Sequence, residues 1–86
     1  MTVGYDVEFR PQAIDEIAEF AKADREGVRA LLDRLELLAD DPRPAGAFAY
    51  GPDHLRVQVG FYRVLIEIDE DEPPRVLIAH VGRAGS

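Results

Sequence analysis

The chain has 86 residues, no cysteine and a formal net charge of −7. This length suits one hydrophobic core, so we expect a single domain over residues 1–86. Without cysteine there is no disulfide framework, thiolate nucleophile or thiolate metal site. The acidic balance argues against a general nucleic-acid binder, because non-specific affinity comes mainly from Lys and Arg.

The first residues carry no apolar leader, and no apolar run approaches the roughly 18 residues of a membrane span. We therefore expect a soluble, cytoplasmic protein. Residues 5–9 alternate apolar and charged side chains, which predicts a short strand. Pro11 suits the first turn of a helix, and apolar residues continue at helical spacing to Ala21.

Asp24 is a plausible N-cap for a second helix. Its apolar stripe runs from Val28 to Ala39 and must stop near Asp40, because the residue before Pro42 is disfavoured in the α region. Few residues separate the two helices, so we expect an antiparallel helical hairpin. Both helices need a sheet to cover their apolar stripes.

Residues 40–53 contain three prolines and two glycines and are predicted to form a loop, with a brief strand at 47–50. Residues 69–72 are four consecutive acids followed by two prolines, which predicts an exposed turn. Residues 75–81 form a continuous apolar run, which predicts a central strand covered on both faces.

The strongest pattern is a β-hairpin over residues 54–68, with a two-residue turn at Gly60 and Phe61. Glycine at the first turn position favours a type II′ turn. This register opposes Val59 to Tyr62 and places alternate apolar residues on one face. The predicted fold is α+β, in the order β-αα-βββ, a small, mainly antiparallel sheet with the helical hairpin on one face.

The same register gathers polar side chains on the opposite face of the hairpin. Arg56, Gln58 and Arg63 lie there, and Arg83 follows the last strand. Arginine forks match phosphate oxygens in pairs, so these residues are candidates for phosphate binding. The alternative is that they pair with the many carboxylates of the chain.

His54 and His80 are the two histidines and have side chains suited to acid–base chemistry. The alternatives are a half-exposed surface residue for His54 and a hydrogen-bonded packing residue for His80. The sequence has no phosphate-cradling glycine loop, HExxH motif or Cys/His ligand spacing. We expect no cofactor and no metal site.

Several segments together carry a resemblance to the RelE/ParE toxin superfamily of bacterial toxin–antitoxin systems. They are the opening YDVEF-RPQA, LDRLELLADDPRP at 32–44, the later Gly51, LRVQVGFYRVLIEID at 55–69 and VLIAHVGR at 76–83. The G-x-Y-R-V element at 60–64 is the most specific of them.

The resemblance implies a toxin encoded beside an antitoxin partner that wraps it. RelE-like members cut mRNA on the ribosome, and ParE-like members poison DNA gyrase. In RelE-like enzymes, basic residues on the sheet hold the scissile phosphate while the neighbouring ribose 2′-OH attacks it. Arg63 matches a phosphate-binding arginine of that pattern, Arg56 falls where a basic residue is frequent, and Arg83 is in approximate register with a further arginine.

Two features depart from the RelE-like pattern. Gln58 stands at a second position that is often basic, and no tyrosine or histidine follows Arg83. The expected function is a RelE-like mRNA endonuclease with reduced activity. The alternatives are a gyrase inhibitor, a protein that only binds its antitoxin, and an inactive or stand-alone oligomer. In isolation we expect a weak homodimer through the uncovered sheet near Leu65 and Leu77.

Overall fold

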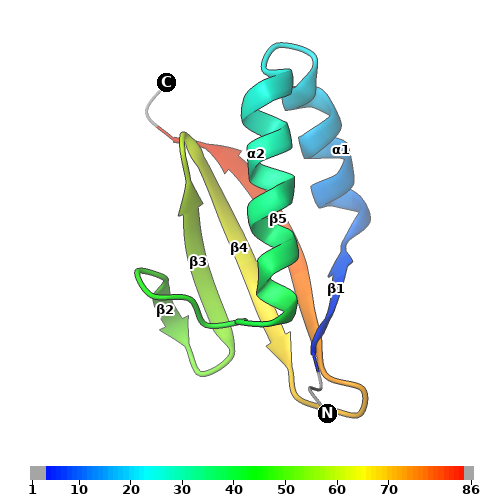
Figure 1. Cartoon of the computed structure of the whole chain (residues 1–86), viewed down its shortest axis with the longest axis vertical. Helices are drawn as coiled ribbons and strands as arrows, with labels where there is room; N and C mark the ends of the chain where they lie inside the picture. Colours follow the sequence, from blue (N-terminus) through cyan, green and yellow to red (C-terminus); the bar gives the residue numbers. More distant parts are fainter. Residues whose placement is uncertain (1–3, 85–86) are drawn as a thin grey trace.

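The computed structural model describes residues 4–84, in which two helices lie against one face of a five-stranded sheet (Figure 1). In chain order the elements are β1 (Asp6–Phe9), α1 (Pro11–Ala21), α2 (Arg25–Glu36), the 3₁₀ helix η1 (Leu37–Ala39), β2 (Phe48–Gly51), β3 (His54–Val59), β4 (Tyr62–Asp69) and β5 (Arg75–Arg83). The strand order is β1-β5-β4-β3-β2. Only the β1–β5 pair is parallel among these neighbours. The predicted α+β fold is confirmed.

The two helices begin and end at the positions that the sequence signals. Pro11 opens α1, and the Asp24 side chain caps α2 by accepting a 3.0 Å hydrogen bond from the Gly27 N–H. The last turn before Asp40 tightens into η1, so the helical segment stops ahead of Pro42 as expected. Within residues 4–84, no helix is both long and apolar enough to cross a membrane.

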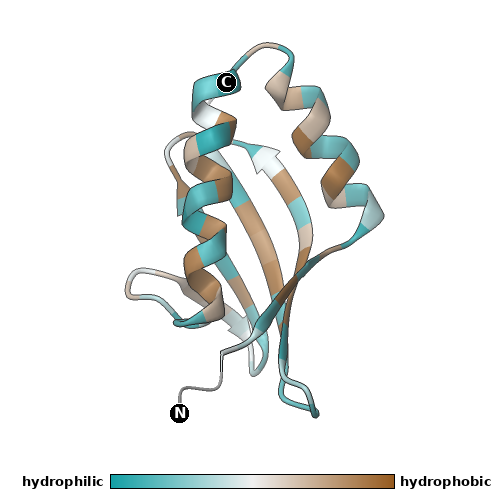
Figure 2. Ribbon diagram, turned by 45° about the vertical axis from the view of Figure 1, so that its right-hand side comes forward, coloured by the Kyte–Doolittle hydropathy of each residue, from teal (hydrophilic) through white to brown (hydrophobic). Residues whose placement is uncertain are grey.

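The core fills the space between the helices and the facing side of the sheet. Apolar residues are concentrated along the central strands and the inner sides of the helices (Figure 2). Each fully buried Leu or Ile stabilises the fold by about 1.5–3 kcal/mol. The core residues are Ala13, Ile17, Val28, Leu31, Leu35, Leu38, Leu55, Val57, Tyr62, Val64, Ile66, Ile68, Val76, Ile78 and Val81.

The β3–β4 hairpin has the predicted register. Val59 pairs with Tyr62, and Gln58 pairs with Arg63. Gly60 has a φ of +59°, while Phe61 is not in the left-handed region, as a type II′ turn requires. The arginines of the hairpin are therefore on the sheet face that the helices do not cover, which we call the open face.

Strand β5 departs from the prediction in one respect. It is central, between β1 and β4, but only one of its faces is fully buried. Ile66 pairs with Ile78, whereas the preceding Leu65 pairs with His80, so Ala79 is an extra residue in a β-bulge. Because of the bulge, His80 is exposed and lies on the open face of the sheet, away from the core. The interpretation of His80 as a packing residue is therefore wrong.

The predicted dimer surface lies on the open face. Leu65 and Leu77 are half-buried there and are not part of the core. Association through this surface remains a prediction.

Candidate functional site

Residues from four strands line up across the open face. Phe48, Arg56, Leu65 and His80 are consecutive partners in the β2–β3, β3–β4 and β4–β5 ladders. Partners directly opposed in a ladder share a sheet face and lie about 5 Å apart. In the neighbouring row, Arg63 is opposed by Gln58 and by Gly82.

A shallow pocket of about 450 Å³ opens over these rows. Three arginines face one carboxylate among its lining residues, so this pocket is locally cationic on a strongly acidic chain. It brings together four of the six predicted site residues. The lining consists of Glu16, Arg56, Arg63, Leu65, His80, Val81, Gly82 and Arg83.

Arg56 and Arg63 are exposed, and neither forms an ion pair with any residue in the described range 4–84. The guanidinium of Arg56 lies 5.0 Å above the exposed Phe48 ring instead. The alternative, that these arginines simply pair with carboxylates, is not what the structure shows. Their donors remain available to an external acceptor.

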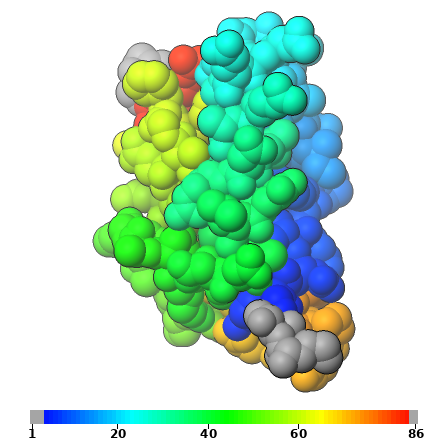
Figure 3. Space-filling view, viewed as in Figure 1, coloured from blue at the N-terminus to red at the C-terminus, as the bar shows by residue number. Residues whose placement is uncertain are grey.

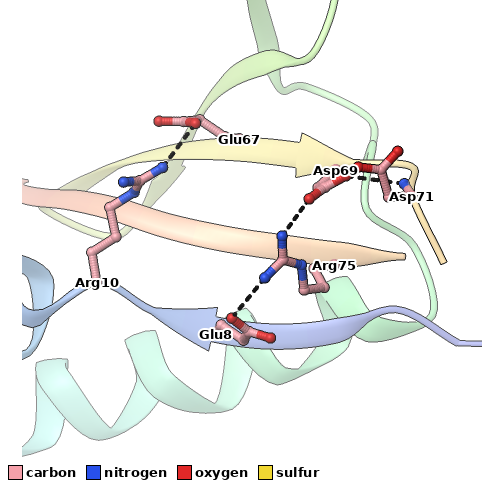
Figure 4. A network of polar contacts seen from close by, with 6 residues as sticks. All are labelled: Glu8, Arg10, Glu67, Asp69, Asp71 and Arg75. Atoms are coloured by element: carbon pink, nitrogen blue, oxygen red, sulfur yellow. Dashed lines mark hydrogen bonds and ion pairs between the residues drawn. The ribbon is translucent and has the colours of Figure 1, made fainter. Parts of the chain in front are cut away.

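The other end of the open face carries a network of ion pairs formed by two different arginines, Arg10 and Arg75 (Figure 4). Arg75 contacts Asp69 and Glu8, and Arg10 lies 2.9 Å from Glu67. The hydrogen bond from Arg75, followed by that from the Asp71 N–H, lowers the pKa of Asp69. These arginines are neutralised within the fold, in contrast to those of the pocket.

Arg83 lies at the rim of the pocket. It is the ladder partner of the buried Tyr62, so its side chain leaves β5 on the sheet face opposite to that of Arg63. Its guanidinium lies 5.8 Å from the centres of the Phe61 and Tyr62 rings. Arg83 is therefore close to the hairpin tip and is not a ladder partner of Arg56 or Arg63.

The tyrosine of the G-x-Y-R-V element has a structural role. The buried Tyr62 hydroxyl donates a 2.7 Å hydrogen bond to Asp24, which joins the hairpin tip to the α1–α2 turn. Figure 3 shows the tip beside that turn. This hydrogen bond and that from Gly27 lower the pKa of Asp24, while burial and then the Asp24 contact raise the pKa of Tyr62. The anchored tyrosine fixes the strand from which Arg63 projects.

Two predicted residues do not line the pocket. Gln58 donates a 3.2 Å hydrogen bond to the Gly60 carbonyl and so supports the turn. His54 pairs with Glu67 in the ladder, and its ring centre lies 5.6 Å from that of Tyr50. It lines a separate acidic depression with residues of the 69–71 turn.

Glu16 is the one charged lining residue that sequence reasoning missed. It comes from α1 and precedes Val81, the residue whose N–H it accepts, by 65 residues. One carboxylate oxygen accepts a 2.8 Å hydrogen bond from the Val81 N–H, and the other lies 3.4 Å from Nδ1 of His80. No local motif around Glu16 signals this contact.

Comparison with known proteins identifies the fold and the family. Residues 7–86 match the family described as the ParE toxin of the type II toxin–antitoxin system parDE. The chain belongs to this family. The predicted membership of the RelE/ParE superfamily is therefore confirmed. A search of curated proteins returned no match.

Solved structures share the fold of this ParE-family chain. The isolated Escherichia coli RelE toxin is 21% identical, with a TM-score of 0.76, over 95% of this chain and 86% of that one. The Mycobacterium tuberculosis RelBE2 toxin–antitoxin complex contains a chain that is 24% identical, with a TM-score of 0.76, over 94% and 99%. A YoeB/ParE toxin from Agrobacterium tumefaciens is 9% identical, with a TM-score of 0.75, over 94% and 99%.

Proposed function

We propose that this chain is the toxin of a type II toxin–antitoxin pair and that it cleaves mRNA in the RelE manner, in the cytoplasm. The observation that carries the proposal is that Arg56 and Arg63 lie in one pocket with His80 and form no ion pair with any residue of the described part of the chain. The chain has 17 acidic residues, yet none of those within the described residues 4–84 forms an ion pair with Arg56 or Arg63, so their donors can bind an anion.

The chemistry follows from the groups that line the pocket. Arg56 and Arg63 bind the non-bridging oxygens of the scissile phosphate and stabilise the charge that develops on them. The imidazole of His80 takes the proton from the adjacent ribose 2′-OH. The 2′-oxygen then bonds to phosphorus as the bond to the 5′-oxygen breaks. The 5′-oxygen takes a proton from water, and protonated His80 gives its proton to the hydroxide that remains. The products are a 2′,3′-cyclic phosphate and a 5′-hydroxyl.

The proposed partner is a cognate antitoxin. Structural neighbours include RelBE2 of Mycobacterium tuberculosis and RelBE of Escherichia coli, both described as toxin–antitoxin complexes. We propose that an antitoxin segment covers the open face and keeps RNA away from Arg56 and Arg63. The ribosome is the proposed site of cleavage.

Gyrase inhibition is the second candidate function. The ParE description of the matching family and the net charge of −7 favour it. Under this alternative the target is a protein, and free phosphate-binding donors are not needed.

Induced expression of the chain alone separates the two functions. Cellular mRNA is mapped for new 5′ ends, and plasmid supercoiling is measured in the same cultures. The proposal predicts growth arrest with new 5′ ends inside coding regions and unchanged supercoiling. Growth arrest with relaxed plasmids and intact mRNA would instead establish the gyrase function.

A further inference from the structure

The carboxylate of Glu16 connects helix α1 to the histidine of the pocket. Its Oε1 accepts the Val81 N–H at 2.8 Å, and its Oε2 lies 3.4 Å from Nδ1 of His80. We infer that Glu16 is a positioning residue, which holds His80 in the orientation and tautomer of a proton acceptor. This inference rests on the proposed RNA cleavage.

The sheet itself explains why a side chain occupies this place. Strand β1 pairs with β5 only from Arg75 to Ile78, and the chain then enters α1. Beyond Ile78 the edge of β5 faces α1, so the Val81 N–H needs an acceptor that β1 does not supply. Glu16 provides it. The backbone contact fixes the carboxylate, whose side chain is 28% exposed.

The β-bulge at Ala79 brings His80 to this carboxylate. In an unbroken strand His80 would share a face with Ile78 and point into the core. The extra residue places it opposite Leu65, in the same row as Arg56. Bulges are a known means of redirecting a side chain beside a site. His80 thereby lines the same pocket as Arg56 and Arg63, with the Glu16 carboxylate beside its Nδ1.

The contact has a direct chemical consequence for the imidazole. A carboxylate beside Nδ1 favours the tautomer with the proton on that nitrogen, which leaves Nε2 as the acceptor. Gln12 Nε2 also lies 3.3 Å from Nδ1, and a half-turn of that amide presents its oxygen to an Nδ1–H. Both side chains of α1 can therefore orient the same ring. Neither needs to contact RNA.

The test compares cleavage by the full chain and its variants on ribosomes carrying mRNA. Glu16→Gln keeps an acceptor for the Val81 N–H but removes the charge. Glu19→Gln is the matched control, because Glu19 is on the same helix, is 73% exposed and contacts only Lys22 among the ion pairs described. Glu16→Gln should lower kcat by roughly 10- to 100-fold with little change in KM, and Glu19→Gln should match the wild type.

A measurement that does not depend on activity reports on the same contact. Nitrogen NMR of the imidazole in the free 86-residue chain should show the Nδ1-protonated tautomer of neutral His80. In Glu16→Gln the population should shift toward the Nε2-protonated form. A wild-type chain with its proton mainly on Nε2 would overturn the inference.

The outcomes separate this inference from the proposed function. Cleavage by the wild type with an unchanged kcat in Glu16→Gln overturns the role of Glu16 alone. His80→Gln provides a second variant at a half-exposed side chain, and a wild-type kcat in that chain also overturns the inference. Absence of cleavage by the wild type overturns the proposed function and this inference together.

Discussion

Gly82 lies directly opposite Arg63 in the β4–β5 ladder, so no side chain from β5 stands beside this arginine. A Cβ atom at position 82 would meet nothing within 4 Å. The space over Arg63 is therefore open because of one residue that lacks a side chain.

Gly82→Glu should block the pocket. The introduced carboxylate would lie beside Arg63 and supply an ion-pair partner, which this arginine does not find among the described residues. We expect RNA cleavage to fall roughly 100-fold, because a charge-stabilising donor is occupied. Stability should change by about 0.5 kcal/mol or less at this exposed position. Gly82→Gln, with a neutral side chain of the same size, should lose less activity. Equal losses in the two variants would show that bulk, not charge, is responsible.

Tyr62→Phe should destabilise the fold. It removes a hydroxyl that donates from a buried position to the Asp24 carboxylate. Loss of a hydrogen bond to a charged acceptor in a domain of this size should lower Tm by roughly 5–10 °C. Tyr5→Phe is the control, because its hydroxyl donates an exposed hydrogen bond of the same 2.7 Å length to Glu70. Thermal unfolding that gives equal Tm values for the two variants would contradict the anchoring role of Tyr62.

The Tyr62–Asp24 contact should also make stability depend on pH. The pKa of Asp24 is lower in the folded chain than in the unfolded chain. Its contribution to stability is therefore present above its pKa in the unfolded chain and is lost as pH falls through its pKa in the folded chain. The pKa of Tyr62 is raised in the folded chain. Its contribution to stability is therefore present below its pKa in the unfolded chain and is lost as pH rises through its pKa in the folded chain. Urea unfolding should show a constant difference in the free energy of unfolding between wild type and Tyr62→Phe from about pH 5 to 9. This difference in the free energy of unfolding should become smaller below about pH 4 and above about pH 10. An equal difference in the free energy of unfolding at pH 3 and pH 7 would contradict this pH dependence.

The hairpin was predictable because its information is local. Alternation over β3 and β4 and the glycine of the turn determine the register, and the register determines which face carries Arg56 and Arg63. Long-range features were not accessible in this way. The extra residue Ala79 reverses the alternation of β5, and nothing in an apolar run marks where a bulge occurs. The alternation alone therefore left a packing role open for His80, and the bulge excludes that role.

The candidate site shows the same division. His54 and His80 are equally suited to proton transfer by residue type, and only their partners across the sheet separate them. His54 is opposed by Glu67 near the acidic turn, whereas His80 lies in the row of Arg56. The contact from Glu16 depends on α1 lying along the part of β5 that β1 does not pair with, and no spacing in the sequence predicts that arrangement.

Mapping of mRNA 5′ ends after the purified chain has acted on translating ribosomes tests the central claim most directly. Wild type, Arg63→Ala and Arg29→Ala are compared at equal concentration, with Arg29 as an exposed arginine of α2 outside the pocket. We predict discrete cuts by the wild type and by Arg29→Ala, and a rate lower by about 10²–10³-fold for Arg63→Ala. Cleavage by a folded Arg63→Ala chain at the wild-type rate, or intact mRNA with the wild type, would contradict the account.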